Sequence, residues 1–583
     1  MSSFFFNRLL RFIIAAVLFG GCSSRHSAGT AIRIRWAHDP ETLEPMASHN
    51  QEAIDANNLL HISLLQASSE LMQPVPALAE QLPEVQYLPD SLMTLRYRLR
   101  PQARWDDGQP VLATDVAFSL KLMSCPGLPN EIVRNQFAFM RTFVPDSLNP
   151  RGFTLGCLGH SPEFVVASGD FCILPEARID PHHRLRRYSL RALQLLPATQ
   201  TTDTALLALS RDYQALDLAR HPERVAGCGP YRLTSWQKDR RLSFRRKATW
   251  WADQLPQAPL PLQARAAQLD YVIIPEATAA TLALRRGDLD VYPQVPARDF
   301  ARLRIAAATT QRPLRCYATP SYDVVTAGFN TRRPALADAP TRRALGRLFD
   351  AAGLLRATQL GEGRRTVGII SPLDRANYND SLPLIPFAPA EAARLLRKAG
   401  WQQASGPAGQ WQRPGTGQKE GLSLSVRYRA EDDLMATIAL QFRAAAQAQG
   451  IAVRLQPTES GQFAAALRAG DFDMYLRTLK GNPFVFNFTP LLHSSAVGEG
   501  NLTGFGTPTS DRLIEDLATA ETPARRAVLL HRFQALMQQE LPLMPLFFLP
   551  NRVAAAANLS GLHVGSLKPG FTAATIERAT PAP

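Results

Sequence analysis

The sequence predicts an α/β protein of several domains, and two stretches of the chain indicate this most clearly. In each stretch, an apolar run typical of a strand is followed by a helical period and a second strand: residues 269–293 and residues 422–458. The length of 583 residues, at roughly 150 per domain, gives about four domain-sized units. With 45% apolar and 20% charged residues, the composition is that of a globular chain with packed cores.

The first 22 residues are typical of a bacterial secretion signal that ends in a lipidated cysteine. Arg8 and Arg11 form a basic start, an apolar run covers 12–19, and Gly20-Gly21-Cys22 resembles a lipobox, in which Cys22 is acylated after export. The apolar run is shorter than the roughly 18 residues that a membrane-spanning helix needs. We therefore expect a soluble body, tethered through Cys22 and the small polar segment 23–30 to a membrane on the periplasmic side of the envelope.

The first part of the body contains short strands and one capped helix. Residues 31–37 and 95–99 alternate apolar and polar side chains, which predicts half-buried strands. Residues 106–108 read as a turn, and Thr114-Asp115 opens a helix. The segment 157–223 is irregular and reads as an elaboration of the fold.

The rest of the body continues with a hairpin and further helices. A glycine-proline turn at 227–231 leads into RLTSW and RLSFRR, which predict the two strands of a hairpin. Residues 340–360 and 389–400 have a helical period.

Charge and cysteine content exclude several classes of protein. The net charge of +14 comes from arginine pairs scattered along the chain, which favours a solvated basic surface over nucleic-acid binding and leaves an anionic ligand or lipid open. Five cysteines follow Cys22, and none has the spacing of a metal site. Cys157 and Cys172 are the most plausible disulfide, with buried unpaired thiols as the alternative.

The ordered set of segments resembles the family 5 extracellular solute-binding proteins, which are the dipeptide-, oligopeptide- and nickel-binding components of bacterial ABC importers. Each segment is weak evidence alone, whereas eleven in the same order are strong evidence. The segments are DPETLEP (39–45), PALAEQLP (76–83), LRYRLRPQARWDDGQPVLATDVAFSL (95–120), GCGPYRL (227–233), LALRRGDLDVYP (282–293), GFNTRRP (328–334), TRRALGRLFD (341–350), PAEAARLLRKAGW (389–401), GIAVRLQ (450–456), GDFDMYL (470–476) and LPLMPLF (541–547).

The resemblance implies a bilobal periplasmic-binding-protein-like fold of class II with an extra inserted domain, three domains in all. Domain I would comprise 31–65, 216–321 and 541–583; domain II would be 66–215, and domain III 322–540. Two bodies would close over a ligand by a hinge and present it to an ABC permease and its ATPase. A monomer without a cofactor is expected.

The resemblance also implies where ligand binds. In peptide-binding members, an Asp in a Gly-Trp-x-x-Asp stretch pairs with the peptide's amino group; here Leu479 replaces the Trp and Asn482 replaces the Asp. Because an amide has no charge and Lys480 adds a positive one, an anionic group is favoured over an ammonium. We expect the ligand-binding residues to include Trp36, His38, Leu479, Lys480, Asn482 and Phe484, with Phe486 as a further candidate.

No motif in the sequence supports catalysis. The chain lacks G-x-S-x-G, H-E-x-x-H and the phosphate-binding G-x-x-x-x-G-K-[ST], and the adjacent His182 and His183 read as a surface loop rather than a metal site. The sequence therefore predicts a binding protein for a peptide or similar polar solute. The alternative is a receptor-like lipoprotein that senses a non-peptide, possibly anionic, ligand.

Overall fold

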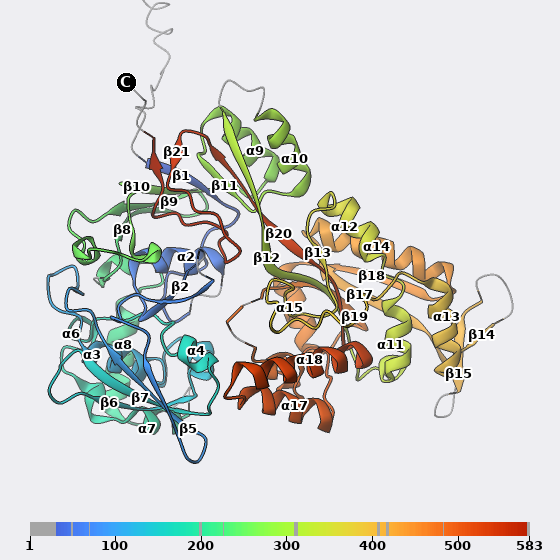
Figure 1. Cartoon of the computed structure of the whole chain (residues 1–583), viewed down its shortest axis with the longest axis horizontal. Coiled ribbons are helices and arrows are strands. Elements are labelled where there is room, and N and C mark those ends of the chain that lie inside the picture. The colour runs from blue at the N-terminus through green and yellow to red at the C-terminus, as the bar shows by residue number, and fades with distance from the viewer. Residues whose placement is uncertain are drawn as a thin grey trace, which may run out of the picture.

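The computed structural model shows two lobes joined by two long strands (Figure 1). It describes residues 31–47, 50–68, 70, 72–197, 201–225, 227–307, 313–404, 409–414, 419–481, 483, 484 and 486–579. The predicted signal and lipidation site Cys22, the tether 23–30 and the candidate Asn482 lie outside the described residues.

One sheet of 11 strands extends through both lobes, in the order β18-β17-β19-β12-β20-β11-β1-β10-β9-β8, with β13 paired to β20. In the first lobe, β1 (Ala31–Trp36) runs parallel to β10 (Gln268–Ile273), and helix α9 (Ala277–Arg286) returns the chain to β11 (Val291–Pro293) on the other side of β1. The expected strand, helix and strand are confirmed. The expected hairpin is also present as β8 (Tyr231–Gln237) and β9 (Arg241–Arg246).

A second sheet of four strands lies in the lower part of the first lobe, in the order β4-β5-β7-β6. The predicted strand at 95–99 belongs to β5, and the predicted helix is α3, which begins at Ala113. The segment 157–223, which was expected to be irregular, contains among its described residues four α-helices, of which α8 has 12 residues, and a 3-10 helix at Arg184–Arg187. The elements of this region are α2 (Gln51–Leu60), β2 (Leu65–Ser68), β3 (Gln73–Pro76), β4 (Glu84–Leu88), β5 (Leu92–Arg98), α3 (Ala113–Leu122), α4 (Glu131–Gln136), β6 (Met140–Pro145), β7 (Gly152–Leu158), α5 (Glu163–Ala167), α6 (Glu176–Ile179), α7 (Leu190–Leu195) and α8 (Thr204–Ala215).

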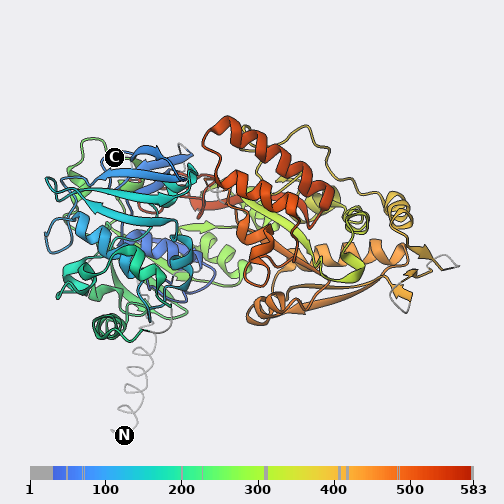
Figure 2. The same ribbon diagram turned by 90° about the horizontal axis from the view of Figure 1, so that it is seen from below.

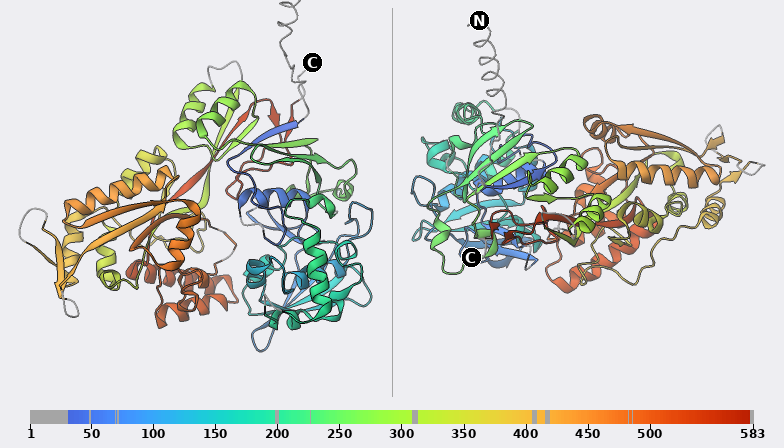
Figure 3. Two further views of the ribbon diagram at one scale, coloured as in Figure 1. Left: turned by 180° about the vertical axis from the view of Figure 1, so that it is seen from behind. Right: turned by 90° about the horizontal axis from the view of Figure 1, so that it is seen from above.

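Two strands connect the lobes. β12 (Leu314–Phe329) and β20 (Leu543–Ala556) are antiparallel over almost their whole length, from the pair Leu314↔Ala556 to the pair Gly328↔Leu543. Their pairing is interrupted between Pro320 and Val324. Figures 2 and 3 show that this ribbon crosses from one lobe to the other, and α10 (Ala297–Ala306) leads into it from the first lobe.

The second lobe packs helices on its half of the large sheet. The segment expected as one helical stretch, 340–360, forms two helices, α11 and α12, because Asp350 caps a new helix by accepting a hydrogen bond from the Gly353 N–H. The elements are α11 (Ala339–Gly346), α12 (Ala351–Gln359), β13 (Arg364–Arg365), α13 (Pro389–Lys398), β14 (Gln402–Gln403), β15 (Trp411–Pro414), β16 (Lys419–Gly421), β17 (Ser423–Arg429), α14 (Asp433–Ala448), β18 (Ala452–Thr458), α15 (Ser460–Ala469), β19 (Met474–Leu479), α16 (Thr489–Leu492), α17 (Pro508–Ala518) and α18 (Pro523–Glu540); β21 (Leu559–Ser560) and β22 (Glu577–Arg578) return to the first lobe.

The described part of the chain shows whether the cysteines are paired and whether any helix could cross a membrane. Cys125, Cys157, Cys172, Cys228 and Cys316 are all free thiols, so the Cys157–Cys172 disulfide is absent and the alternative of unpaired thiols holds. Within the same ranges, no helix combines the length and the apolar composition needed to cross a bilayer.

Candidate functional site

A cleft of about 980 Å³ opens in the second lobe on the side that faces the first lobe. Its walls come from the end of β19, helix α15, the start of α14, the segment 369–374 and the loop 481–502. Gln136, at the end of α4 in the first lobe, also lines it. The cleft therefore lies where the two lobes meet, as a binding site that closes over its ligand requires.

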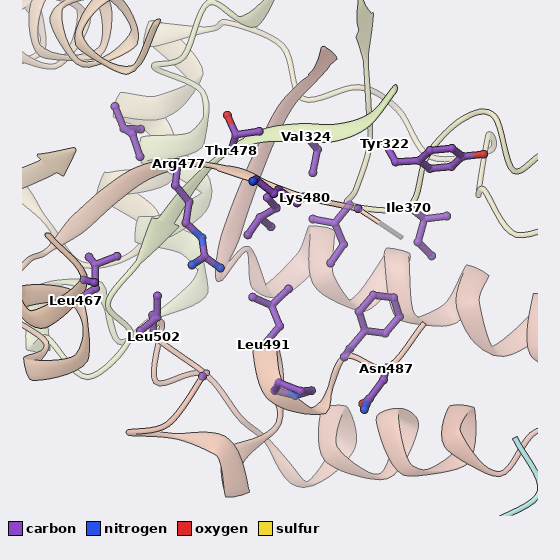
Figure 4. Close-up of a pocket in the computed structure, with 18 of the residues that line it drawn as sticks. Tyr322, Val324, Ile370, Leu467, Arg477, Thr478, Lys480, Asn487, Leu491 and Leu502 are labelled. Atoms are coloured by element: carbon purple, nitrogen blue, oxygen red, sulfur yellow. The ribbon is translucent and has the colours of Figure 1, made fainter. Parts of the chain in front are cut away.

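Strand β19 forms the central wall. Met474 and Leu476 are buried in the core cluster beneath one face of the sheet, whereas Tyr475 belongs to the cluster on the other face. Side chains alternate along a strand, so Arg477 and Leu479 follow Tyr475 toward the cleft. Figure 4 shows Arg477 extending from the strand into the cleft, with Leu467, Leu491 and Leu502 around the end of its side chain.

Most of the lining is apolar. Val324 and Leu476 come from the sheet, Leu467 from α15 and Leu491 from α16, and Phe486 and Phe488 lie on the loop between β19 and α16. Phe488 stacks on Phe533 of α18, with ring centroids 4.3 Å apart. This packing fixes the loop against the helices behind it.

Four cations and three carboxylates complete the lining: Arg429, Arg468, Arg477 and Lys480, with Asp374, Asp432 and Glu499. Asp432 caps α14 by accepting a hydrogen bond from the Met435 N–H, and Asp374 accepts one from the Asn377 side chain. Burial and the nearby charge of Lys568 lower the pKa of Lys480, against the opposing influence of Asp323 and Glu52. Lys568 itself pairs with Asp323, at 2.6 Å.

The ligand-binding residues predicted around the end of β19 fall into three groups. Leu479, Lys480 and Phe486 line the cleft, whereas Phe484 is half-buried nearby and is not among the lining residues. Asn482 lies outside the described residues. The geometry thus brings Leu479, Lys480 and Phe486 together at the cleft.

Trp36 and His38 lie on the first lobe. Trp36 is buried, stacks on Tyr271 at 3.9 Å, and lines a separate small pocket of about 20 Å³ with Glu52 and Asp55 of α2. His38 is exposed. It lies near Glu431 of the second lobe, whose pKa is lowered by the Ser460 hydroxyl and, more weakly, by Arg429 and His38.

Sequence reasoning missed the three arginines of the cleft. Arg429 ends β17, Arg468 lies near the end of α15, and Arg477 lies near the end of β19. The alternation of MYLRTL could have placed Arg477 on the same face as Leu479, which was a candidate. No pattern in the sequence places Arg429 or Arg468 at the same site, since they come from different elements.

Two polar contacts lie between the lobes. The backbone N–H of Phe486 donates a hydrogen bond of 2.6 Å to Glu163 of α5, and His160 Nδ1 lies 2.6 Å from a carboxylate oxygen of Glu521. Both join the first lobe to the second. Elsewhere in the described part of the chain, no three His, Cys, Asp or Glu side chains are grouped closely enough to hold a metal ion.

Comparison with known proteins identifies the family and the relatives of this chain. Residues 175–497 match the family described as bacterial extracellular solute-binding proteins, family 5 Middle. Protein XP55 of Streptomyces lividans is 25% identical over 513 residues, covering 87% of this chain and 81% of the relative. The peptidoglycan-binding protein YepA of Agrobacterium fabrum is 23% identical over 547 residues, covering 84% and 80%.

Solved structures share the fold. The oligopeptide-binding protein AppA from Bacillus subtilis, in complex with a nonapeptide, superimposes with a TM-score of 0.72 at 17% identity, covering 94% of this chain and 99% of AppA. At this level of identity the likeness concerns the fold alone. The expected α/β class and bilobal architecture are thereby confirmed.

Proposed function

The chain belongs to family 5 of the bacterial extracellular solute-binding proteins, and from this premise we propose that it captures a peptide or similar polar solute in the cleft and delivers it to the permease of an ABC importer. Members of this family bind solutes rather than convert them, so the chain is a transport component and not an enzyme. The observation that carries the proposal is the cleft of about 980 Å³, lined mainly by the second lobe and bordered by the first. This volume lies at the upper end of the range for ligand pockets.

The peptide part of the proposal draws on the relatives. AppA of Bacillus subtilis holds a nonapeptide, and the Agrobacterium relative is described as binding peptidoglycan. A mostly apolar cleft with polar groups from several elements suits a ligand that has a polar backbone and variable side chains. The ladder between β19 and β17 stops at Tyr475, so the half-buried end of β19 beside the cleft would offer unpaired backbone groups to such a ligand.

Closure of the lobes about the β12–β20 ribbon would couple binding to delivery. The interruption of the ribbon between Pro320 and Val324 lies at the proposed boundary between domain I, which ends its second segment at 321, and domain III, which begins at 322. Two strands are a slender connection that can bend at an irregular step of the ladder. Domain II, proposed as 66–215, would move with domain I as one body, because one core cluster contains residues of both.

The proposed location at a membrane follows from the N-terminal segment. A lipid on Cys22 and the tether 23–30 would hold a monomer at the outer face of a membrane, next to the permease. The first described strand, β1, starts at Ala31, directly after the tether.

Mass spectrometry of the solute that copurifies with the full-length chain tests the proposal. The protein would be purified in detergent from its host and denatured, and we expect short peptides of mixed sequence in the released fraction. Ala464→Trp would fill the cleft, because Ala464 is an exposed residue of α15 that lines it, and should abolish the copurifying peptides. Ala465→Trp is the matched control on the same helix, exposed but outside the lining. Peptides absent from both the parent and the control, or retained in Ala464→Trp, would overturn the proposal.

A further inference from the structure

Arg477 extends into the cleft without a charge partner. Its guanidinium carbon lies 5.4 Å from the centroid of the Tyr475 ring, and its Nε is buried without a hydrogen-bond acceptor among the residues that the structure describes. A buried donor that is left unsatisfied destabilises the folded state unless something else accepts its hydrogen. A ligand oxygen in the cleft would do so.

The other cations of the cleft are similarly unpaired. Within the described ranges, Arg429, Arg468 and Lys480 make no ion pair with a carboxylate at 4.0 Å or less, although three carboxylates line the same cleft. Arg429 lies over the ring of Phe463 instead, at 5.9 Å. Unpaired cations that converge on a partly apolar cavity attract an anion, because the low-dielectric walls strengthen the attraction.

The carboxylates of the cleft are poorly placed to bind an ammonium group. Asp432 and Asp374 accept hydrogen bonds from their own segments, as the cap of α14 and in the turn after Ser371. Glu499 is exposed at the surface. Among the cations, Arg429, Arg468 and Lys480 are likewise exposed, whereas Arg477 is half-buried, so Arg477 is the cation best placed to meet a ligand inside the cleft.

We propose that Arg477 binds a carboxylate of the solute, and that this anchor, rather than an ammonium group, holds the solute in the cleft. The arginine fork matches a carboxylate with two parallel hydrogen bonds, and Lys480, one residue past the end of β19, supplies a second positive charge at the cleft. The apolar walls around Arg477, formed by Leu467, Leu491 and Leu502, fit an apolar group next to that carboxylate. Solutes with a blocked amino end are accepted. This inference rests on the proposed function of the same cleft and narrows its substrate class.

Three tripeptide libraries built from Ala, Val, Leu and Phe separate the possibilities: one with free ends, one amidated at the carboxyl end and one acetylated at the amino end. Binding to the full-length chain in detergent would be measured by competition and mass spectrometry. We expect the free and acetylated libraries to bind similarly and the amidated library at least about tenfold more weakly, the range for losing a charge-assisted hydrogen bond.

Arg477→Gln should weaken the free and acetylated libraries by about tenfold or more and leave the amidated library unchanged. Arg477→Lys should restore part of the difference, because it returns the charge without the fork. Arg454→Gln is the control, an exposed arginine on β18 outside the cleft lining. Replacing Arg477 removes no ion pair among the described residues, so these variants should fold.

The outcomes distinguish a failure of the carboxylate anchor from a failure of the proposed peptide capture. Equal binding of all three libraries, unaffected by Arg477→Gln but lost in Ala464→Trp, would overturn the carboxylate anchor and leave peptide capture standing. If only the acetylated library failed to bind, the carboxylate anchor would also be overturned, since an ammonium group would then hold the solute. No binding of any library would overturn both.

Discussion

The Glu163 carboxylate accepts a hydrogen bond of 2.6 Å from the backbone N–H of Phe486, a residue 323 positions later in the sequence and on the other lobe. Phe486 lines the cleft, and Glu163 is buried where the lobes touch. Burial raises the pKa of Glu163 to about 7, against the lowering effects of the Phe486 N–H and the charge of Arg526. Contact between the lobes is therefore linked to a proton.

Lower pH should favour the closed arrangement of the lobes. If separation of the lobes returns Glu163 to water and to its usual pKa of about 4.3, the closed form binds the proton more tightly than the open form. Closing then takes up a proton, so the closed form becomes more stable relative to the open form as pH falls from about 7 toward the usual pKa of Glu163. Small-angle X-ray scattering of the ligand-free chain should show a smaller radius of gyration at pH 5.5 than at pH 8.5.

Glu163→Gln should make that radius less dependent on pH, because the amide oxygen still accepts from Phe486 and does not titrate. Glu84→Gln, an exposed position on β4 of the same lobe, should change nothing. The linkage is wrong if Glu163→Gln keeps the full pH dependence of the parent.

The second contact between the lobes should raise the pKa of a histidine. His160 Nε2 lies 3.0 and 2.8 Å from the carbonyl oxygens of Leu88 and Leu92 and so carries a hydrogen, and Nδ1 faces Glu521. The hydrogen bond to Glu521 raises the pKa of His160 above its usual value of about 6.5. We expect Glu521→Gln to lower that pKa, as followed by the NMR shift of the ring proton, while Glu223→Gln, beside His221, leaves it unchanged. An identical titration in Glu521→Gln would mean that the lobes do not keep this contact in solution.

Local patterns in the sequence predicted much of the first lobe. β1, β5, α3 and the β8–β9 hairpin follow from two-residue alternation, a capping signal and a glycine-proline turn, all of which act within a few residues. Helix α18 was not predicted. Its apolar residues Val528, Leu529 and Leu530 are contiguous rather than spaced along one face, and the buried Gln534 interrupts the stripe. Its position depends on packing that only the folded lobe provides.

The candidate site was predictable only where a family motif marks it. Leu479 and Lys480 were placed at the cleft by their position in such a motif, and the structure puts them among its lining residues. Arg477 is one of 64 lysines and arginines, and nothing local separates it from those that face solvent. Its place in the cleft depends on Leu491 and Leu502, which follow β19 in the sequence and line the cleft with it.

Two buried tyrosines should respond differently to loss of the hydroxyl. Within the described residues, the Tyr475 hydroxyl has no hydrogen-bond partner, whereas that of Tyr213 donates to the Glu44 carboxylate. Tyr475→Phe should therefore change the free energy of unfolding by less than about 1 kcal/mol or increase it, and Tyr213→Phe should lower it by about 1.5–3 kcal/mol. Urea denaturation measures both. A larger loss in Tyr475→Phe than in Tyr213→Phe would contradict the assignment of the unsatisfied hydroxyl.

Among the carboxylates of the first lobe, Asp290 should contribute most to the stability of the fold. It is fully buried between β1 and the C-terminal β22, where it accepts hydrogen bonds from the Arg33 N–H and guanidinium, at 2.9 to 3.0 Å, and from Arg578 at 2.8 Å. Burial by itself would raise the pKa of Asp290, but the hydrogen bonds and charge of Arg33, aided by Arg578, hold it below its usual range. Its ionised form therefore stabilises the fold above a pH of about 4, and this contribution is lost as pH falls through the lowered pKa.

Asp290→Asn should lower the free energy of unfolding at pH 7 by about 3–5 kcal/mol, because both arginines lose their counter-charge. Asp288→Asn, two residues earlier and exposed, is the matched control and should change it by less than about 0.5 kcal/mol. Urea denaturation at pH 7 and pH 3 completes the test: the difference between the parent and Asp290→Asn should shrink at the lower pH, and an equal difference at both would show that the charge of Asp290 is not what stabilises the lobe.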